Sequence, residues 1–242
     1  MSQVVGLNPV GALLAESPER VRVLYVQRGR RDQRMSEVVS AARANGIRVE
    51  FAERTWLDGR VDGKHQGVIA DCHDLALADE KALEARWPEL EPPLLILVLD
   101  GITDPRNLGA CLRSANAAGV DAVLVPRRNS APLNEAALKA AAGGAEGLFL
   151  VEVTNLARRI EWLKEQGIWV FGADGEGDSV WVDADFRDNC AIVLGSEGEG
   201  MRSLTRKLCD RIVRIPMQGT VSSLNVSVAA GILLFEAVRQ RG

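Results

Sequence analysis

Six short apolar runs, separated by helical or polar segments, follow one another between residues 94 and 215. They span residues 94–99, 122–125, 148–153, 169–172, 191–194 and 212–215. Continuous rather than alternating hydrophobicity is typical of strands that are covered on both faces. The pattern therefore predicts an α/β domain with a mostly parallel sheet of about six strands.

Local signals place helices between most of these strands. Asp104 and Pro105 mark a helix start, because a carboxylate caps the first free amide groups and proline fits the first turn. That helix extends to about residue 118, and the next clear one spans 154–166. The last helix begins near residues 222–225. Its apolar stripe, which faces either the core or a partner subunit, contains Val228, Ile232, Phe235 and Val238.

The first 70 residues have a pattern of their own. Strand-like runs at 21–27, 47–52 and 67–70 surround a helical stretch at 36–44, which is typical of a small α/β module. The segment that follows is acidic and ends in prolines, a composition that favours a linker. We therefore predict a first domain over residues 1–73, a linker over 74–93 and a second domain over 94–242.

Composition excludes several classes of protein. Of 242 residues, 47% are apolar and 26% are charged, which excludes a disordered or low-complexity chain. No apolar run approaches the ~20 residues of a membrane span, and no secretion signal is visible, so we expect a cytoplasmic protein without membrane association. The four cysteines and two histidines are not spaced as metal ligands. We expect buried, reduced thiols and no metal site.

The charge distribution leaves one question open. The net charge of −4 does not indicate a nucleic-acid-binding protein, yet residues 1–70 carry eleven Lys and Arg against eight Asp and Glu. Their densest cluster comprises Arg28, Arg30, Arg31 and Arg34, directly after a predicted strand. Such a cluster either follows the phosphates of RNA or is a solvated face, and charge alone does not decide between them.

Three segments that follow predicted strands are candidate ligand loops. GADGEG at 172–177 lacks the G-x-G-x-x-G spacing of a dinucleotide-binding loop, and the residues after it do not have a helical pattern. GSEGEG at 195–200 lets a ligand approach the backbone, but its two glutamates would repel a pyrophosphate and tolerate a cation. The segment 215–227 supplies four hydroxyl side chains. Because ligands of open α/β sheets bind beyond the carboxyl ends of the strands, a site is expected here.

Two kinds of enzyme are disfavoured. No histidine lies near any of these loops in the sequence, which disfavours Ser/His/Asp nucleophilic catalysis. No Walker A sequence is present, which argues against an enzyme that holds nucleotide phosphates in a P-loop.

Three segments of the chain carry a family resemblance. They are LDGITDPRNLGACLRSA at 99–115, IVLGSEGEGM at 192–201 and IPMQGTVSSLNVS at 215–227. In this order and spacing they closely resemble the three motifs of the SpoU (TrmH-type) branch of the SPOUT RNA 2′-O-ribose methyltransferases. Near the N-terminus, VGLNPV at 5–10 and HQGV at 65–68 are similar to the substrate-binding domain of the same enzymes. The resemblance thus spans nearly the whole chain.

The resemblance implies a fold and a cofactor. The first domain should have a ribosomal-protein L30-like fold and bind RNA, and the second should be an α/β domain with a C-terminal trefoil knot, an exception to the rule that chains are unknotted. S-adenosylmethionine should bind in the knot, largely through backbone groups. The family works as a homodimer whose interface includes the final helix. The matching cofactor-binding positions are Gly172, Gly195, Ile215, Met217 and Leu224.

The resemblance also implies catalytic positions. Arg113 matches the motif arginine that the family places near the attacking hydroxyl. A guanidinium holds its proton firmly, so binding the target phosphate is physically easier for it than acting as a general base, although deprotonation remains open. Asn107, Ser223 and Asn225 match positions that orient this arginine, the substrate or the cofactor loop. Glu197 either accepts a hydrogen bond or favours the positive sulfonium.

At full length the resemblance implies 2′-O-methylation of a guanosine in the P-site loop of 23S rRNA, as free RNA or in a large-subunit precursor. Two alternatives stay open at this point. One keeps methyl transfer but acts on a tRNA ribose or another rRNA site. The other is a non-catalytic RNA-binding factor in ribosome assembly, which the intact motif residues disfavour.

Overall fold

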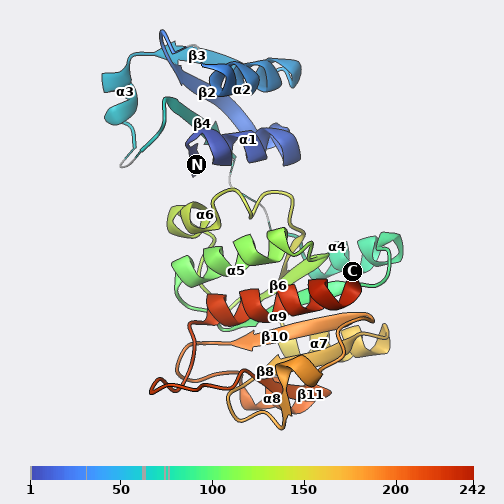
Figure 1. Ribbon diagram of the computed structural model, residues 1–242. Helices are drawn as coiled ribbons and strands as arrows, with labels where there is room; N and C mark the ends of the chain where they lie inside the picture. Colours follow the sequence, from blue (N-terminus) through green and yellow to red (C-terminus); the bar gives the residue numbers. More distant parts are fainter. Residues whose placement is uncertain (1, 31, 62–63, 74, 76) are drawn as a thin grey trace.

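The chain forms two sheets, each with its own core (Figure 1). The computed structural model describes residues 2–30, 32–61, 64–73, 75 and 77–242. The smaller sheet lies within residues 2–72, drawn in blue in Figure 1, and the larger one lies within residues 95–214. The two sheets correspond to the two α/β patterns in the sequence.

The N-terminal domain contains a four-stranded mixed sheet in the order β1-β4-β2-β3. Strands β2 and β3 are parallel, and β4 runs antiparallel to both β1 and β2. The elements are β1 (Ser2–Val5), α1 (Leu7–Glu16), the 3₁₀ helix η1 (Pro18–Arg20), β2 (Val21–Gln27), α2 (Gln33–Ala44), β3 (Arg48–Ala52), α3 (Arg54–Asp58) and β4 (Val68–Cys72).

Helix α1 was not expected from the sequence. It begins after Gly6 without a side-chain cap and contains Gly11, both of which weaken an isolated helix. Val10 and Leu13 are fully buried in the N-terminal core. Tertiary packing therefore stabilises this helix where local propensity does not.

The segment interpreted as a linker contains helix α4 (Glu80–Arg86) and the 3₁₀ helix η2 (Trp87–Glu89). Leu83 is fully buried in the core of the larger domain. Buried Arg159 pairs with Glu80 and with Glu84 at 3.1 and 2.9 Å. This part of the segment thus packs on the C-terminal domain, and its acidic side chains are the partners of that arginine.

The larger sheet is parallel throughout and has the order β7-β6-β5-β10-β8-β11-β9. All six predicted strands are present, and the two-residue strand β9 adds a seventh. The elements are β5 (Leu95–Asp100), α5 (Pro105–Ala117), β6 (Ala122–Pro126), α6 (Glu135–Ala141), β7 (Leu150–Val153), α7 (Leu156–Glu165), β8 (Trp169–Ala173), β9 (Ser179–Val180), the 3₁₀ helix η3 (Trp181–Asp183), β10 (Cys190–Gly195), α8 (Ser203–Leu208), β11 (Arg211–Arg214) and α9 (Val226–Arg241).

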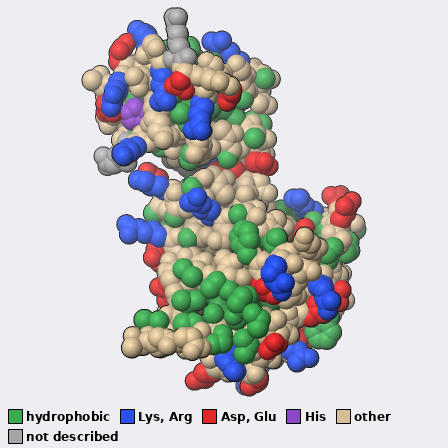
Figure 2. Space-filling view, viewed as in Figure 1, with side chains coloured by type: hydrophobic (Ala, Val, Ile, Leu, Met, Phe, Trp, Pro, Cys, Tyr) green, Lys and Arg blue, Asp and Glu red, His purple; other side chains and the backbone are tan. Residues whose placement is uncertain are grey.

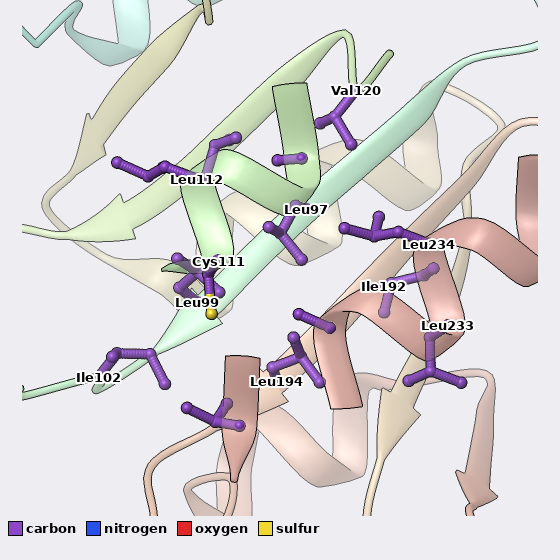
Figure 3. Close-up of a cluster of buried hydrophobic side chains, with 14 of the residues drawn as sticks. Leu97, Leu99, Ile102, Cys111, Leu112, Val120, Ile192, Leu194, Leu233 and Leu234 are labelled. Atoms are coloured by element: carbon purple, nitrogen blue, oxygen red, sulfur yellow. The ribbon is translucent and has the colours of Figure 1, made fainter. Parts of the chain in front are cut away.

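Both faces of this sheet are covered, as continuous hydrophobicity predicts. In β5, Leu97 and Leu99 belong to a core shared with α5 and α9, whereas Ile96 and Val98 belong to a core on the other face. Figure 3 shows the first of these cores, in which Leu234 of α9 lies beside Leu97 and Ile192 of the sheet. The prediction of an α/β domain with a parallel sheet is confirmed.

Helix starts follow the predicted capping chemistry. The side chain of Asp104 accepts a hydrogen bond from the Arg106 amide at 2.8 Å at the start of α5. Asn225 caps α9 by accepting from the Ser227 amide at 2.9 Å.

Among the described residues, no helix is long and apolar enough to cross a bilayer.

Candidate functional site

The candidate site lies at the carboxyl edge of the larger sheet, where the predicted loops meet. Strands β5 and β10 are adjacent and parallel, and Asp100 pairs with Gly195 at their ends. The connection from β11 to α9 then brings residues 215–225 back toward the start of α9 (Figure 1). All three motif segments thereby reach the same edge of the sheet.

The segment after β10 is a tight backbone hairpin. Ser196 and Gly200 exchange two backbone hydrogen bonds of 3.0 Å, so Glu197 and Glu199 are exposed at the tip. A Cβ atom on Gly195 would lie 2.0 Å from the carbonyl carbon of Gly200. Only glycine is compatible with this close approach of two backbone strands.

An amide–carboxylate cluster joins the three motif segments. Asn225 Nδ2 donates to Asn107 Oδ1 at 2.9 Å and to Glu197 Oε1 at 2.6 Å. Asn225 Oδ1 meanwhile accepts from the amide and hydroxyl of Ser227 at the start of α9. The hydrogen-bonding capacity of Asn225 is therefore used to hold α5, the 195–200 hairpin and α9 in one arrangement.

Two other predicted catalytic residues lie outside this cluster. Arg113 and Ser223 are both exposed, and neither makes a hydrogen bond to another described side chain. Arg113 follows Asn107 by six residues on α5, which places it roughly 120° around the helix and about 9 Å further along its axis. Within one chain, Arg113 and the cluster therefore do not form one continuous site.

The predicted cofactor-binding residues divide into two groups. Gly172 is buried, and a Cβ atom there would lie 2.7 to 2.9 Å from side-chain atoms of Met201, Cys209 and Ile212. Close packing thus accounts for this glycine. The remaining positions lie on or beside the loops at the carboxyl edge: Gly195, Ile215, Met217 and Leu224.

Sequence reasoning missed a buried acid at the base of the hairpin. Asp100 is 1% exposed and accepts from the Arg202 amide at 2.9 Å, while its other oxygen lies 2.7 Å from Nε of the same arginine. This pair ties the end of β5 to the chain that leaves the hairpin. A carboxylate directly after a fully apolar strand was the signal that could have singled out Asp100.

A cavity of about 580 Å³ opens beside the hairpin. It is lined by residues of the β5–α5 connection, including Gly101 and Thr103, by Asn129, and by the hairpin itself. This volume falls in the range of small-molecule sites, and most of the lining residues are polar. None of the five predicted cofactor-binding residues lines this cavity, which lies on the β5 side of the hairpin: Gly172, Gly195, Ile215, Met217 and Leu224.

Thiol chemistry has no place in this site. Burial, with a smaller contribution from the Glu197 carboxylate, raises the pKa of Cys111 to about 12. Burial likewise raises the pKa of Cys209, beside Gly172, to about 12. All four cysteines are free, and both of these stay protonated at neutral pH. Within the described residues, no group of three or more His, Cys, Asp or Glu could hold a metal ion.

The basic cluster of the N-terminal domain lies on the connection between β2 and α2. Arg28 is exposed and 3.3 Å from Glu53, and Arg30 pairs with Asp32. The Arg30 guanidinium lowers the pKa of Asp32. Arg34 is exposed in the first turn of α2, while Arg31 lies outside the described residues. Acidic neighbours thus offset part of the positive charge of this cluster.

Two family models match different parts of the chain. The family model of the SpoU rRNA Methylase family matches residues 94–235. A second model, described as RNA 2′-O ribose methyltransferase substrate binding, matches residues 3–77. The two matches leave only residues 78–93 between them, where α4 lies.

Individual relatives match over the full length. The chain is 49% identical to the 23S rRNA (guanosine-2′-O-)-methyltransferase RlmB of Escherichia coli (strain K12) over 243 residues, which covers 100% of both chains. It is 48% identical to the protein of the same name from Yersinia pestis over 244 residues, covering 100% of this chain and 99% of that one.

A solved structure has a similar fold over nearly the whole chain. The SpoU methyltransferase AviRb from Streptomyces viridochromogenes, in complex with the cofactor AdoMet, has a TM-score of 0.80 and 26% sequence identity. The match covers 99% of this chain and 90% of that one. Together with the family model that spans most of the C-terminal domain, these similarities show that the chain belongs to the SpoU rRNA methylase family.

Proposed function

We propose that this protein transfers a methyl group from S-adenosylmethionine to the 2′-oxygen of a guanosine in 23S rRNA, in the P-site loop. The observation that carries this proposal is the cluster of Asn107, Glu197 and Asn225, which joins the three motif segments at one edge of the sheet. Full-length relatives that methylate a guanosine of 23S rRNA support the substrate.

The residues at this edge suit a sulfonium cofactor. When bound, S-adenosylmethionine would supply a methyl group that is activated by its positively charged sulfur. The ribose oxygen would form a bond to the methyl carbon, and the sulfur would leave as part of S-adenosylhomocysteine. Glu199 is exposed and, within the described part of the chain, makes no ion pair, and Glu197 accepts a hydrogen bond from no described side chain other than Asn225. These carboxylates favour a cation over a pyrophosphate. We infer that backbone groups at Gly195, Ile215 and Leu224, with Met217 nearby, hold the nucleoside part of the cofactor. The close packing at Gly172 in β8 would help to position these loops.

Arg113 has the chemistry to activate the ribose. Its guanidinium donates hydrogen bonds in a planar fork that matches a phosphate, and it keeps its proton in proteins. We propose that Arg113 binds the target phosphate, and that its positive charge favours loss of the 2′-hydroxyl proton. Ser223, in the segment before α9, then contacts the substrate or the cofactor.

A second copy of the chain would complete the site. Arg113 and the Asn107 cluster lie on different faces of α5, so one chain does not bring them together. Helix α9 exposes Val228, Phe235 and Val238, which are 49%, 48% and 37% accessible. Figure 2 shows apolar side chains gathered over the region of α9. We propose that this patch is the interface of a homodimer that shares its sites between subunits.

The dimer proposal predicts that Phe235→Glu gives a monomer. A charge placed in the centre of a buried apolar interface is costly because it must lose its water. Sedimentation velocity should show the mass fall to that of one chain, and methyl transfer should be lost with it. Trp169→Glu, at an equally exposed apolar residue of β8, is the control and should remain a dimer. A dimeric Phe235→Glu protein would show that α9 is not the interface.

We further propose that residues 1–73 are the L30-like RNA-binding domain, joined through residues 74–93 to a knotted methyltransferase domain over 94–242. The insertion of β10 between β5 and β8 supports the knot, since the chain must return into the middle of the sheet. Figure 2 shows Lys and Arg side chains across the visible face of the first domain. Because its substrate is ribosomal RNA, we place the protein in the cytoplasm.

This domain assignment predicts the effect of reversing Arg28, Arg30 and Arg31 to Glu. The salt dependence of RNA affinity is described by the slope of the logarithm of the association constant against the logarithm of the salt concentration. Loss of each phosphate contact makes this slope shallower by about 0.7–0.9, so the loss of three contacts changes it by roughly 2. Filter binding of rRNA fragments at several salt concentrations measures the slope. Arg187→Glu, on an exposed loop of the other domain, is the control. An unchanged slope would make the cluster a solvated surface.

The proposed activity is tested with the purified full-length protein and labelled S-adenosylmethionine. The protein should label 23S rRNA, and nuclease digestion should release the label as 2′-O-methylguanosine. S-adenosylhomocysteine, but not ATP or NAD, should raise its melting temperature. Label in tRNA with none in 23S rRNA would keep the chemistry and change the substrate. Absence of both binding and transfer would favour a non-catalytic RNA-binding factor.

A further inference from the structure

The two domains meet at the loop of residues 142–147, which follows α6. A Cβ atom on Gly143 would lie 3.1 Å from Ala12 Cβ, and one on Gly147 would lie 2.9 Å from a carboxylate oxygen of Glu16. Helix α1 of the N-terminal domain thus rests directly on this loop. Both glycines also have a positive φ, of +92° at Gly143 and +73° at Gly147, which a larger residue adopts only with strain.

A buried ion pair crosses this junction. The guanidinium of Arg20, at the end of η1, pairs with the carboxylate of Glu146 in the loop. Their side chains are only 9% and 3% exposed. Arg20 Nη2 also donates to the carbonyl oxygen of His73 at 3.1 Å. A charge left unpaired in such a place is strongly unfavourable, so the pair selects one register between the two domains over neighbouring ones.

The same loop rests on the helix that carries Arg113. A Cβ atom on Gly144 would lie 2.9 Å from the Cα atom of Arg113. One turn later on α5, Asn116 Nδ2 donates to the carbonyl oxygen of Glu146 at 3.2 Å. The loop is therefore in direct contact with the N-terminal domain on one side and with the backbone of α5 at Arg113 on the other.

We propose that Arg20, Glu146 and Asn116 are positioning residues that form an interdomain latch, which sets the orientation of the RNA-binding domain relative to Arg113. The proposal rests on the proposed function, because its purpose is to present the ribose of bound RNA to that arginine. None of the three residues belongs to the motif segments that touch the candidate site. An error of about 1 Å in such an alignment costs roughly 100-fold in rate.

The central variant replaces both charges, Arg20→Met with Glu146→Leu. Replacement of a buried ion pair by apolar side chains of similar size is often neutral for stability, but it removes the directional contact. We expect a melting temperature near that of the wild type and dissociation constants for S-adenosylhomocysteine and rRNA within about twofold. The kcat for 23S rRNA should fall about tenfold. A purely structural role would change the melting temperature and leave kcat unchanged.

The single variant Glu146→Leu gives a readout that does not depend on activity. It leaves the Arg20 charge buried without its partner, so the domains should separate to hydrate it. Small-angle X-ray scattering should then show a larger radius of gyration than for the wild type. The control is Arg127→Met with Glu152→Leu, an exposed pair within the C-terminal domain, which should change neither scattering nor kcat.

The outcomes separate the latch from the proposed function. A double variant with wild-type kcat, or a single variant with wild-type scattering, would overturn the latch. A wild-type protein that does not methylate 23S rRNA would overturn the proposed function, and the scattering comparison would then decide whether Glu146 orients the domains.

Discussion

Arg113→Ala is expected to reduce kcat for rRNA methylation by about 10²–10³-fold and to leave the binding of S-adenosylhomocysteine within about twofold. The guanidinium acts on the ribose and its phosphate, where charge develops as the 2′-hydroxyl loses its proton. Arg113 is exposed on α5 and, among the described residues of one chain, makes no hydrogen bond or ion pair with the loops at Gly195 and Ile215 that we assign to the cofactor. Its removal should therefore affect transfer and not cofactor affinity.

Single-turnover kinetics and isothermal titration calorimetry measure the two quantities separately. Arg113→Lys keeps the positive charge but loses the planar fork, so it should retain part of the activity. An equal loss of S-adenosylhomocysteine affinity in Arg113→Ala would contradict the assigned role, because it would place the side chain at the cofactor.

Gly195→Ala is expected to unfold the hairpin and abolish cofactor binding. The added Cβ atom would lie 2.0 Å from the Gly200 carbonyl carbon, and the three nearest atoms all belong to the backbone, so no side chain can move aside. Overpacking of this kind destabilises a protein by about 3 kcal/mol or more. For a chain of this length that lowers the melting temperature by roughly 6–12 °C.

The matched control is Gly175→Ala, in another loop at the same edge of the sheet. No atom lies within 4 Å of a Cβ atom there, so alanine should be accommodated. Differential scanning fluorimetry with and without S-adenosylhomocysteine measures both effects. A Gly195→Ala protein that keeps the cofactor-induced increase in melting temperature would contradict the proposed cofactor site at this hairpin.

The strands of the larger sheet could be predicted from the sequence because burial on both faces leaves a local signal. In β5 every residue from Leu95 to Leu99 is apolar, and all are buried. Helix α1 could not be predicted, because it lacks a side-chain cap and contains Gly11, and because packing in the N-terminal core holds it in place. Helix α4 was missed because its acidic residues indicate a linker until their partner Arg159, some 75 residues later, is known.

The candidate site was less accessible to sequence reasoning than the fold. Capping rules place Asn107 in the first turn of α5, but only the family motifs associate it with Glu197 and Asn225. The structure then brings these three side chains into hydrogen-bonding contact. The Arg20–Glu146 pair left no pattern at all, since it depends on how two separate domains pack.

The most direct measurement is mass-spectrometric mapping of ribose methylation in rRNA and tRNA from cells with and without this gene. Our proposal predicts loss of a single 2′-O-methylguanosine in the P-site loop of 23S rRNA, restored by the wild-type gene and not by Arg113→Ala. Loss of a methyl group from a tRNA ribose, with 23S rRNA unchanged, would contradict the proposed substrate.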